Sequence, residues 1–215
     1  MKEVEVLSVA SGNSKKVGLK PEIFEVEPNS HVEYLYIKSY LANHRQGTHK
    51  AKQRGEITGS TRKLHRQKGT GGSRKGDIKN PLFKGGGRVF GPLPRDYSLK
   101  INKKVKSLAR LSALSRKGSS DNVLVIEDIT FNGCKTKEFT GMLAKLNIQC
   151  SDKGKILLVL SSFKKNVYLA SRNLPNVSIV TYDLLNAYFV AVSNKVIFEE
   201  SALSNLEELV LANNK

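Results

Sequence analysis

The sequence predicts an α/β protein with a Rossmann-like, mainly parallel sheet that carries helices on both faces, plus a long, extended, basic internal loop. From residue 122 onward, short runs of β-branched and aliphatic residues alternate with segments of helical spacing, which is typical of a parallel sheet covered on both sides. Before that region lies a stretch rich in glycine, arginine and lysine that contains few large apolar residues. We therefore divide the chain into the N-terminal part of a globular domain (1–44), the basic loop (45–95) and the main part of the globular domain (96–215).

The first elements are two strands and a helix. Residues 3–9 ("EVEVLSV") and 17–26 ("VGLKPEIFEV") have strand-like patterns. A helix over 30–43 is predicted because Ser30 and Glu33 form an S-x-x-E capping box. Apolar residues then recur at helical spacing at Val32, Leu35, Tyr36 and Tyr40.

A second helix is predicted over 102–117, with Asn102 as its N-cap and Gly118 as its stop signal. Its predicted apolar face consists of Val105, Leu108, Ala109, Leu111 and Ser112. The remaining strands are predicted over 122–129, 155–160, 177–182 and 195–198, and the remaining helices over 136–147, 164–173, 183–189 and 201–211.

The charge of the chain is concentrated in one segment. The formal net charge is +17, and residues 45–117 hold 21 of the 36 lysines and arginines but only three acids, Glu56, Asp77 and Asp96. The rest of the chain is nearly neutral, with 15 basic and 16 acidic side chains. Such a balance predicts a polyanionic partner for the basic segment.

The basic segment has too few apolar residues to form a core of its own. Between Gly55 and Asn80 the only aliphatic residues larger than alanine are Ile57, Leu64 and Ile78. Three such side chains cannot offset the entropy of ordering that backbone, so we expect it to order on its partner.

A membrane is not the expected partner. No run of 18 apolar residues occurs, and the basic segment has no apolar face to bury in lipid. The start "MKEVEVLSV" alternates like a strand and does not resemble a signal peptide. Cys134 and Cys150 form no CxxC pair, so we expect two reduced thiols in a cytosolic protein.

The glycine-rich stretch "RQKGTGGSRKGD" (66–77) could in principle be a nucleotide-binding loop. However, Arg74 stands where a dinucleotide fingerprint needs its third glycine, and Asp77 and Ile78 follow Gly76 where a phosphate loop needs Lys and Ser or Thr. The preceding "STRKLHRQ" cannot be a buried strand, so no helix N-terminus is held against a sheet there. A nucleotide site is therefore disfavoured, and we expect no cofactor.

Metal and acid–base chemistry are also disfavoured. His44, His49 and His65 lie in or beside the basic loop without nearby cysteines, and the three acids cannot hold a two-metal centre. The remaining rival is a nucleotide-dependent or RNA-modifying enzyme on a Rossmann-like sheet. Saturable binding of ATP or S-adenosylmethionine without RNA would favour that rival.

Binding to a folded RNA accounts for the same features directly. Arginine and lysine neutralise phosphates and release counterions, and glycine lets the backbone pass close to a neighbouring strand. Stacking surfaces are available at His65, Phe83, Phe90 and Tyr97. A long internal excursion suits crevices within a folded RNA better than the surface of a duplex.

At these residues a family resemblance becomes plain. The stretches "TRKLHRQKGTG", "NPLFKGGGRVFGPLPRDYSLKINKKVK" and "LSALS" resemble the bacterial large-subunit (50S) ribosomal protein L-four family, most strongly over 46–116. The resemblance implies a non-enzymatic structural constituent of the large ribosomal subunit, located in the cytoplasm. It further implies a primary ribosomal RNA-binding protein that acts early in assembly and whose loop tip lines the nascent-polypeptide exit tunnel.

The resemblance also implies partners and site residues. The partners would be large-subunit ribosomal RNA, neighbouring ribosomal proteins and the nascent polypeptide near the tip, without membrane or homo-oligomer. The tip would comprise Arg66, Gln67, Lys68, Gly69, Thr70 and Gly71. RNA-binding residues would be Arg45, Lys50, Lys52, Arg54, Arg62, Lys63, His65, Arg66, Gln67, Lys68, Arg74, Lys75, Lys79, Lys84, Arg88, Arg95, Lys103 and Lys104. The chain departs from the family pattern at Leu64-His65, where Pro-Trp is usual, and at Gly72, where Arg is usual.

Overall fold

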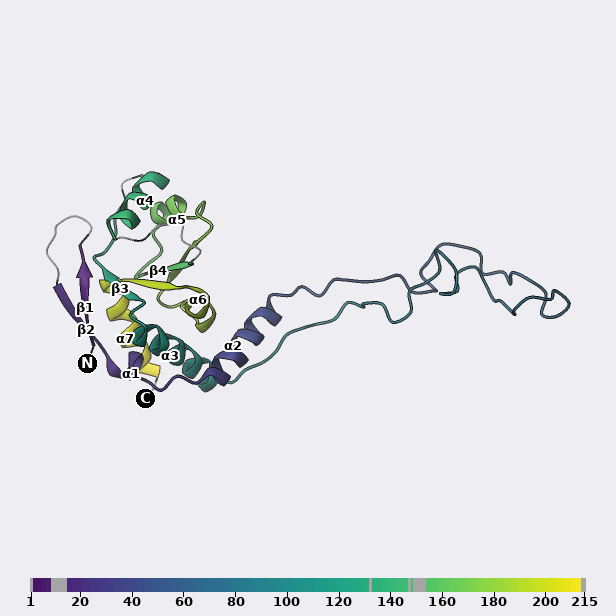
Figure 1. Cartoon of the computed structure of the whole chain (residues 1–215), viewed down its shortest axis with the longest axis horizontal. Helices are drawn as coiled ribbons and strands as arrows, with labels where there is room; N and C mark the ends of the chain where they lie inside the picture. The colour runs from purple at the N-terminus through teal and green to yellow at the C-terminus, as the bar shows by residue number, and fades with distance from the viewer. Residues whose placement is uncertain (1, 9–14, 132, 147, 149–153, 214–215) are drawn as a thin grey trace. The chain divides into compact units, whose positions relative to one another are not determined.

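The computed structural model describes residues 2–8, 15–131, 133–146, 148 and 154–213 (Figure 1). The chain forms two compact units. One, here called the globular unit, comprises Met1–Tyr40 and Lys100–Lys215, and the other, here called the loop unit, comprises Leu41–Leu99.

The globular unit is built on a six-stranded sheet with the strand order β2-β1-β3-β6-β4-β5. The strands are β1 (Lys2–Leu7), β2 (Lys15–Leu19), β3 (Val123–Ile126), β4 (Ile156–Leu160), β5 (Val177–Thr181) and β6 (Lys195–Glu199). β1 and β2 pair antiparallel, while every other neighbouring pair is parallel. The predicted mainly parallel sheet is confirmed, with one antiparallel strand at its edge.

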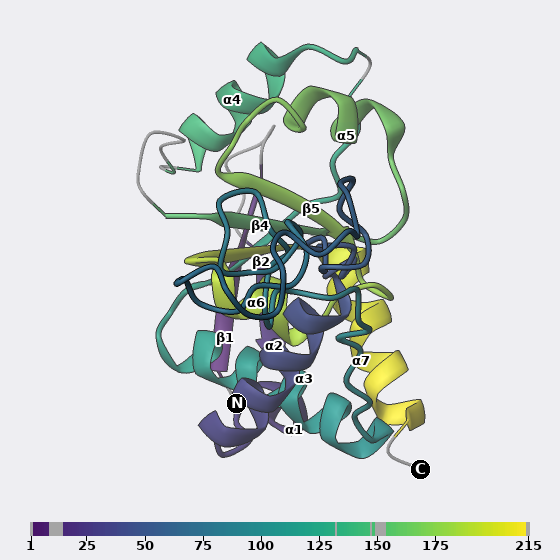
Figure 2. The same ribbon diagram turned by 90° about the vertical axis from the view of Figure 1, so that its right-hand side faces the viewer.

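The helices are α1 (Pro21–Phe24), α2 (Ser30–Asn43), α3 (Lys103–Ser119), α4 (Thr136–Lys145), α5 (Lys165–Ser171), α6 (Ala187–Val192) and α7 (Glu200–Asn213). Helices α4 and α5 cover one face of the sheet, and α1, α3, α6 and α7 cover the other (Figure 1 and Figure 2). All five residues of β4 are buried, and their side chains alternate between two cores. Leu157 and Val159 join the core that α1, α3, α6 and α7 cover, whereas Leu158 belongs to the core beneath α4 and α5. This two-sided burial explains why the strand reads as a continuous apolar run.

The predicted strand over 17–26 is wrong in its second half. The strand ends at Leu19, and Pro21 opens the short helix α1. Proline suits this position because its fixed φ is helical and the first turn needs no N–H donor there. Ile23 and Phe24 point into the core, so the apolar pattern that suggested a strand belongs to a buried helical turn.

The capping box at the start of α2 is also wrong. Asn29 caps this helix, because its Oδ1 accepts hydrogen bonds from the backbone N–H groups of His31 (3.1 Å) and Val32 (3.2 Å). Glu33 is buried, and its side chain contacts α3 and not the first turn of α2. Its carboxylate accepts a 2.6 Å bond from the Ser112 hydroxyl and lies 3.1 Å from the Arg116 guanidinium, which joins α2 to α3.

Three details of α3 differ from the prediction. Asn102 occupies the N-cap position, but its side chain makes no capping hydrogen bond. The helix continues through Gly118 to Ser119, so this glycine is not a stop signal. A Cβ at Gly118 would lie 3.3 Å from the carbonyl oxygen of Phe24, so the glycine allows α1 to pack closely. Leu108 is exposed rather than part of the apolar face, which is instead extended by Ala113 and Leu114.

The helix predicted over 183–189 begins four residues later, at Ala187. Asn186 fixes this start, because its side chain accepts a 3.1 Å hydrogen bond from the Phe189 N–H. Cys134 is a free, exposed thiol, whereas Cys150 lies outside the described residues. Within the described ranges, no helix has the length and apolar character needed to cross a membrane.

Candidate nucleic-acid interface

Residues 44–102, all of which the structure describes, form neither helix nor strand. Within them, an outgoing arm (residues 45–64) and a returning arm (76–95) are joined by backbone hydrogen bonds, here called the cross-arm bonds. The N–H groups of Arg95, Ala51, Arg88 and Leu64 donate to the carbonyls of Gly47 (3.2 Å), Pro92 (2.9 Å), Lys52 (3.0 Å) and Gly76 (3.0 Å), respectively. The two arms therefore run side by side (Figure 1), and the cross-arm bond at Leu64 is the one nearest the tip in sequence.

Glycines have different uses in the arms and at the tip. Gly47 has a φ of +67°, and a Cβ there would lie 2.1 Å from the carbonyl oxygen of Arg95. A Cβ at Gly87 would lie 2.4 Å from the backbone nitrogen of Arg54. Gly69 and Gly71 also have positive φ, but each has open space around it. Gly47 and Gly87 thus permit close approach of the two arms, while Gly69 and Gly71 permit sharp turning at the tip.

A cationic cluster surrounds Tyr97 at the inner end of the arms. The guanidinium carbons of Arg45 and Arg95 lie 4.3 and 4.4 Å from the centroid of the Tyr97 ring. His49 Nε2 lies 2.6 Å from the Tyr97 hydroxyl oxygen, within hydrogen-bond distance. One aromatic ring therefore holds two guanidinium groups close together through cation–π attraction, and both remain exposed.

The three acids of the loop unit are bound within the loop. Glu56 lies 2.5 Å from Lys50 Nζ and accepts a bond from the Gln53 N–H, and the hydrogen bond from Lys50 lowers the pKa of Glu56 below its ordinary value. Asp77 lies 3.3 Å from Arg54. Asp96 accepts bonds from the Ser98 N–H and hydroxyl, which lower its pKa. Each of the three carboxylates therefore has a local partner, while most of the cationic side chains of the loop unit face solvent.

The predicted RNA-binding side chains are mostly exposed. Lys75 and Lys79 are half-buried, and Lys103 and Lys104 lie in the first turn of α3, in the globular unit. The others belong to the loop unit and are exposed, which includes the whole tip from Arg66 to Gly71. Sequence reasoning did not anticipate that Lys50 and Arg54 each pair with a carboxylate of the loop.

The aromatic side chains of the loop unit are not equivalent. Lys75 Nζ lies 5.3 Å from the centroid of the Phe83 ring, and Tyr97 is engaged by two arginines. Phe90 is fully exposed and has a φ of +51°, a backbone conformation that bulky residues rarely adopt. No pattern in the sequence predicts this conformation, although glycines flank that part of the returning arm.

The carboxyl ends of the parallel strands, where α/β folds often bind ligands, are filled by the chain itself. Glu199, the last residue of β6, is completely buried. Its carboxylate accepts hydrogen bonds from the Ile129 N–H (3.1 Å), from the Ser161 N–H (3.0 Å) and hydroxyl (3.2 Å), and from Lys164 Nζ (2.7 Å). Among the residues the structure describes, no group of three or more His, Cys, Asp or Glu side chains could hold a metal ion.

Comparison with known proteins gives a consistent result. Residues 17–209 match the ribosomal protein L4/L1 family. The chain is 51% identical to the large ribosomal subunit protein uL4 of Porphyromonas gingivalis over 198 residues, which is 92% of this chain and 93% of that protein. It is 51% identical to the uL4 protein of Amoebophilus asiaticus over 96% of this chain and 97% of that one. The uL4 protein of Bacteroides fragilis is 48% identical over 97% of this chain and its own full length.

Proposed function

We propose that this chain, which belongs to the ribosomal protein L4/L1 family, binds the RNA of the large ribosomal subunit through its loop unit. The chain is a structural constituent of that subunit and not an enzyme. Lys103 and Lys104 of α3 would add contacts from the globular unit. The globular unit would serve as the folded support from which both arms start. No cofactor takes part in this function.

The observation that supports this proposal is the contrast between paired acids and exposed cations. All three carboxylates of the loop unit have partners within the loop, whereas Arg62 and Arg88 are exposed on the two arms and Arg74 is exposed between them. Unpaired guanidinium and ammonium groups gain most from phosphate, because each contact releases condensed counterions from the RNA. Cross-arm bonds hold these groups on two adjacent backbones.

We extend the proposal to assembly and to the tunnel, on the strength of family membership. A protein that must thread its loop between RNA segments binds more easily before those segments close, so it would act early in subunit assembly. The tip, Arg66 to Gly71, would line the nascent-polypeptide exit tunnel, where its small residues Gly69, Thr70 and Gly71 would leave room for a passing chain. Neighbouring ribosomal proteins and the nascent polypeptide would be its further partners in the cytoplasm.

The salt dependence of RNA binding tests the proposal. If the loop neutralises about six to ten phosphates, the logarithm of the affinity for large-subunit RNA should fall with log salt by roughly 0.7–0.9 per contact. Arg62→Glu and Arg74→Glu should each make that slope shallower. Lys137→Glu, which reverses an exposed charge on α4, is the matched control and should leave the slope nearly unchanged. A salt-independent affinity would rule out phosphate binding by the loop.

A further inference from the structure

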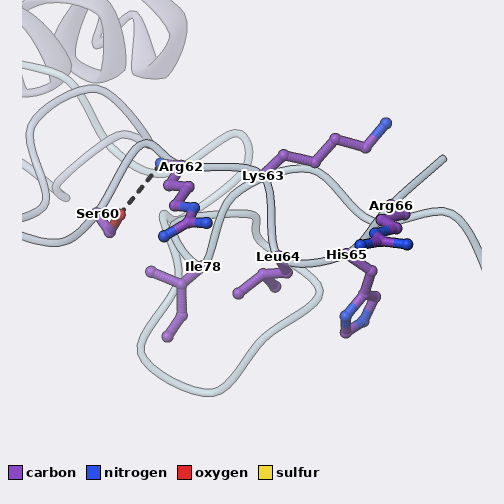
Figure 3. A pocket seen from close by; sticks show the side chains of 7 residues that line it. All are labelled: Ser60, Arg62, Lys63, Leu64, His65, Arg66 and Ile78. Carbon is purple, nitrogen blue, oxygen red and sulfur yellow. Dashed lines mark hydrogen bonds between the residues drawn. The ribbon is translucent and has the colours of Figure 1, made fainter.

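A pocket of about 510 Å³ opens beside the cross-arm bond at Leu64 (Figure 3). It is lined by Ser60 and residues 62–66 on the outgoing side and by Ile78 of the returning arm. Its volume falls within the range of about 300–1,000 Å³ that is usual for small-molecule sites. The pocket lies entirely within the loop unit.

Backbone contacts give this pocket its shape. The Leu64 N–H donates a 3.0 Å hydrogen bond to the Gly76 carbonyl, which brings the segment around Ile78 next to the outgoing arm. The Ser60 hydroxyl oxygen accepts a 3.1 Å bond from the Arg62 N–H and fixes the turn before the pocket. In Figure 3, Arg62, Leu64, His65 and Ile78 extend to one side of the backbone, while Lys63 extends to the other.

The apolar wall of the pocket is unusual for its surroundings. Leu64 and Ile78 are 39% and 50% exposed, so neither belongs to a core. They are two of the three aliphatic side chains larger than alanine between Gly55 and Asn80. The apolar surface that these two side chains leave exposed to water would be removed from water by a ligand that covers them, which would favour binding.

The charge of the lining defines the ligand further. The lining includes the basic side chains of Arg62, Lys63 and Arg66 and the imidazole of His65, and none of the seven lining residues is acidic. A cationic ligand is therefore disfavoured, and an anion with a flat apolar body fits best. An RNA nucleotide has both properties, because its base has an apolar face and its phosphates are negatively charged.

We propose that this pocket holds one unstacked base of large-subunit RNA. The base lies against Leu64 and Ile78, and the guanidinium groups of Arg62 and Arg66 bind the adjoining phosphates. This inference rests on the proposed RNA-binding function. It adds a binding site for one base to the loop unit, whose other proposed contacts are with RNA phosphates. A nascent polypeptide fits less well because its backbone has no phosphate to match the guanidinium groups of Arg62 and Arg66.

The test uses substitutions that remove apolar surface and keep every charge. The full-length chain, Leu64→Ser, Ile78→Ser and the control Leu82→Ser are bound to large-subunit RNA, and chemical modification of unpaired bases is compared. Leu82 suits as a control because it is an aliphatic residue of the same unit, is 88% exposed and does not line the pocket. The wild-type chain and Leu82→Ser should protect the same unpaired base, which should become reactive with Leu64→Ser and Ile78→Ser.

Affinity gives the second readout. Leu64→Ser and Ile78→Ser should each weaken binding by about tenfold, as expected for one buried aliphatic side chain, with an unchanged salt slope. Unchanged protection and affinity in both variants would overturn the base site. A salt dependence of the affinity of Leu64→Ser or Ile78→Ser as shallow as that of Arg62→Glu would also overturn it, because the substitutions would then have removed contacts to phosphates.

If the variants altered translation by assembled subunits but did not change base protection, the occupant of the pocket would be the nascent chain. Absence of salt-dependent binding by the wild-type chain would instead refute the proposed function itself.

Discussion

At the scale of single residues, Phe90 is the most informative side chain of the loop unit. A left-handed backbone costs a non-glycine residue about 1–2 kcal/mol, yet Phe90 adopts it with its ring fully exposed. The ring makes no compensating burial within the chain, so the strain does not serve the stability of the free protein. Such outliers are found at functional sites, and a ring presented to solvent is a suitable surface for base stacking.

Replacing Phe90 should therefore separate binding from stability. Phe90→Ala should weaken binding to large-subunit RNA by about 1–3 kcal/mol, which is the loss expected for one stacked base. Phe90→Gly should lose the same affinity while relieving the backbone strain, so its free energy of unfolding should not fall. Equilibrium binding and denaturant unfolding measure the two effects. Leu93→Ala, on the same arm, is the control, and a stacking role would be excluded if both positions gave the same small change.

At the scale of elements, the buried carboxylate of Glu199 ties together the carboxyl ends of three parallel strands. It bonds to Ile129 after β3 and to Ser161 after β4, and it pairs with Lys164 at the start of α5. Because four donors surround this one carboxylate, removing its charge leaves the Lys164 ammonium without its counterion in a poorly hydrated site. The strand ends depend on this one side chain.

Glu199→Gln should consequently destabilise the globular unit. Breaking a buried ion pair costs about 3–5 kcal/mol, and the loss should lie at the lower end because the Lys164 side chain keeps 22% of its exposure. Denaturant unfolding followed by circular dichroism measures the change. Glu208→Gln, which alters an exposed carboxylate on α7, should shift stability by less than about 0.5 kcal/mol. Equal stability of the two variants would contradict a structural role for the buried pair.

The elements that the sequence predicts well are those with a strong local pattern. The strand over 156–160 is an uninterrupted aliphatic run, and α4 repeats Phe139, Met142 and Leu143 on one side. Some errors have a local cause, such as Pro21 in the predicted strand over 17–26, whereas others occur where a distant residue decides the outcome. Glu33 does not take part in a capping box, because its carboxylate is bound by Ser112 and Arg116 of α3. Gly118 does not end α3; it is a glycine next to Phe24, where a Cβ would come too close.

The same distinction applies to the candidate interface. The excess of cations could be counted from the sequence, and most of the predicted RNA-binding side chains are exposed. The pairing of Arg45 with Tyr97 could not be predicted, because these residues are far apart in the chain and meet only when the arms align. The apolar pocket was missed for a similar reason, since Leu64 and Ile78 come together through the cross-arm bond to Gly76.

At the scale of the whole molecule, affinity and tunnel shape are expected to come from different parts of the loop. Deleting Lys68 through Gly71 removes one of the 21 basic residues between 45 and 117 and leaves every cross-arm bond in place. By the additive counterion argument, RNA binding and incorporation into large subunits should be nearly normal. Translation by those subunits should nevertheless respond differently to a macrolide, because the deletion would reshape the tunnel. Failure of the variant to enter subunits would show that the tip is needed for assembly.

The cross-arm bonds have a consequence for how such a loop can change during evolution. A residue gained or lost in one arm moves every later donor away from its carbonyl unless the opposite arm changes at the same time. Beyond Leu64 and Gly76 there is no such bond to preserve, so residues 65–75 can lengthen or shorten in a single mutational event. Among related chains, insertions and deletions should accumulate in that segment, and the arms should be inherited at constant length.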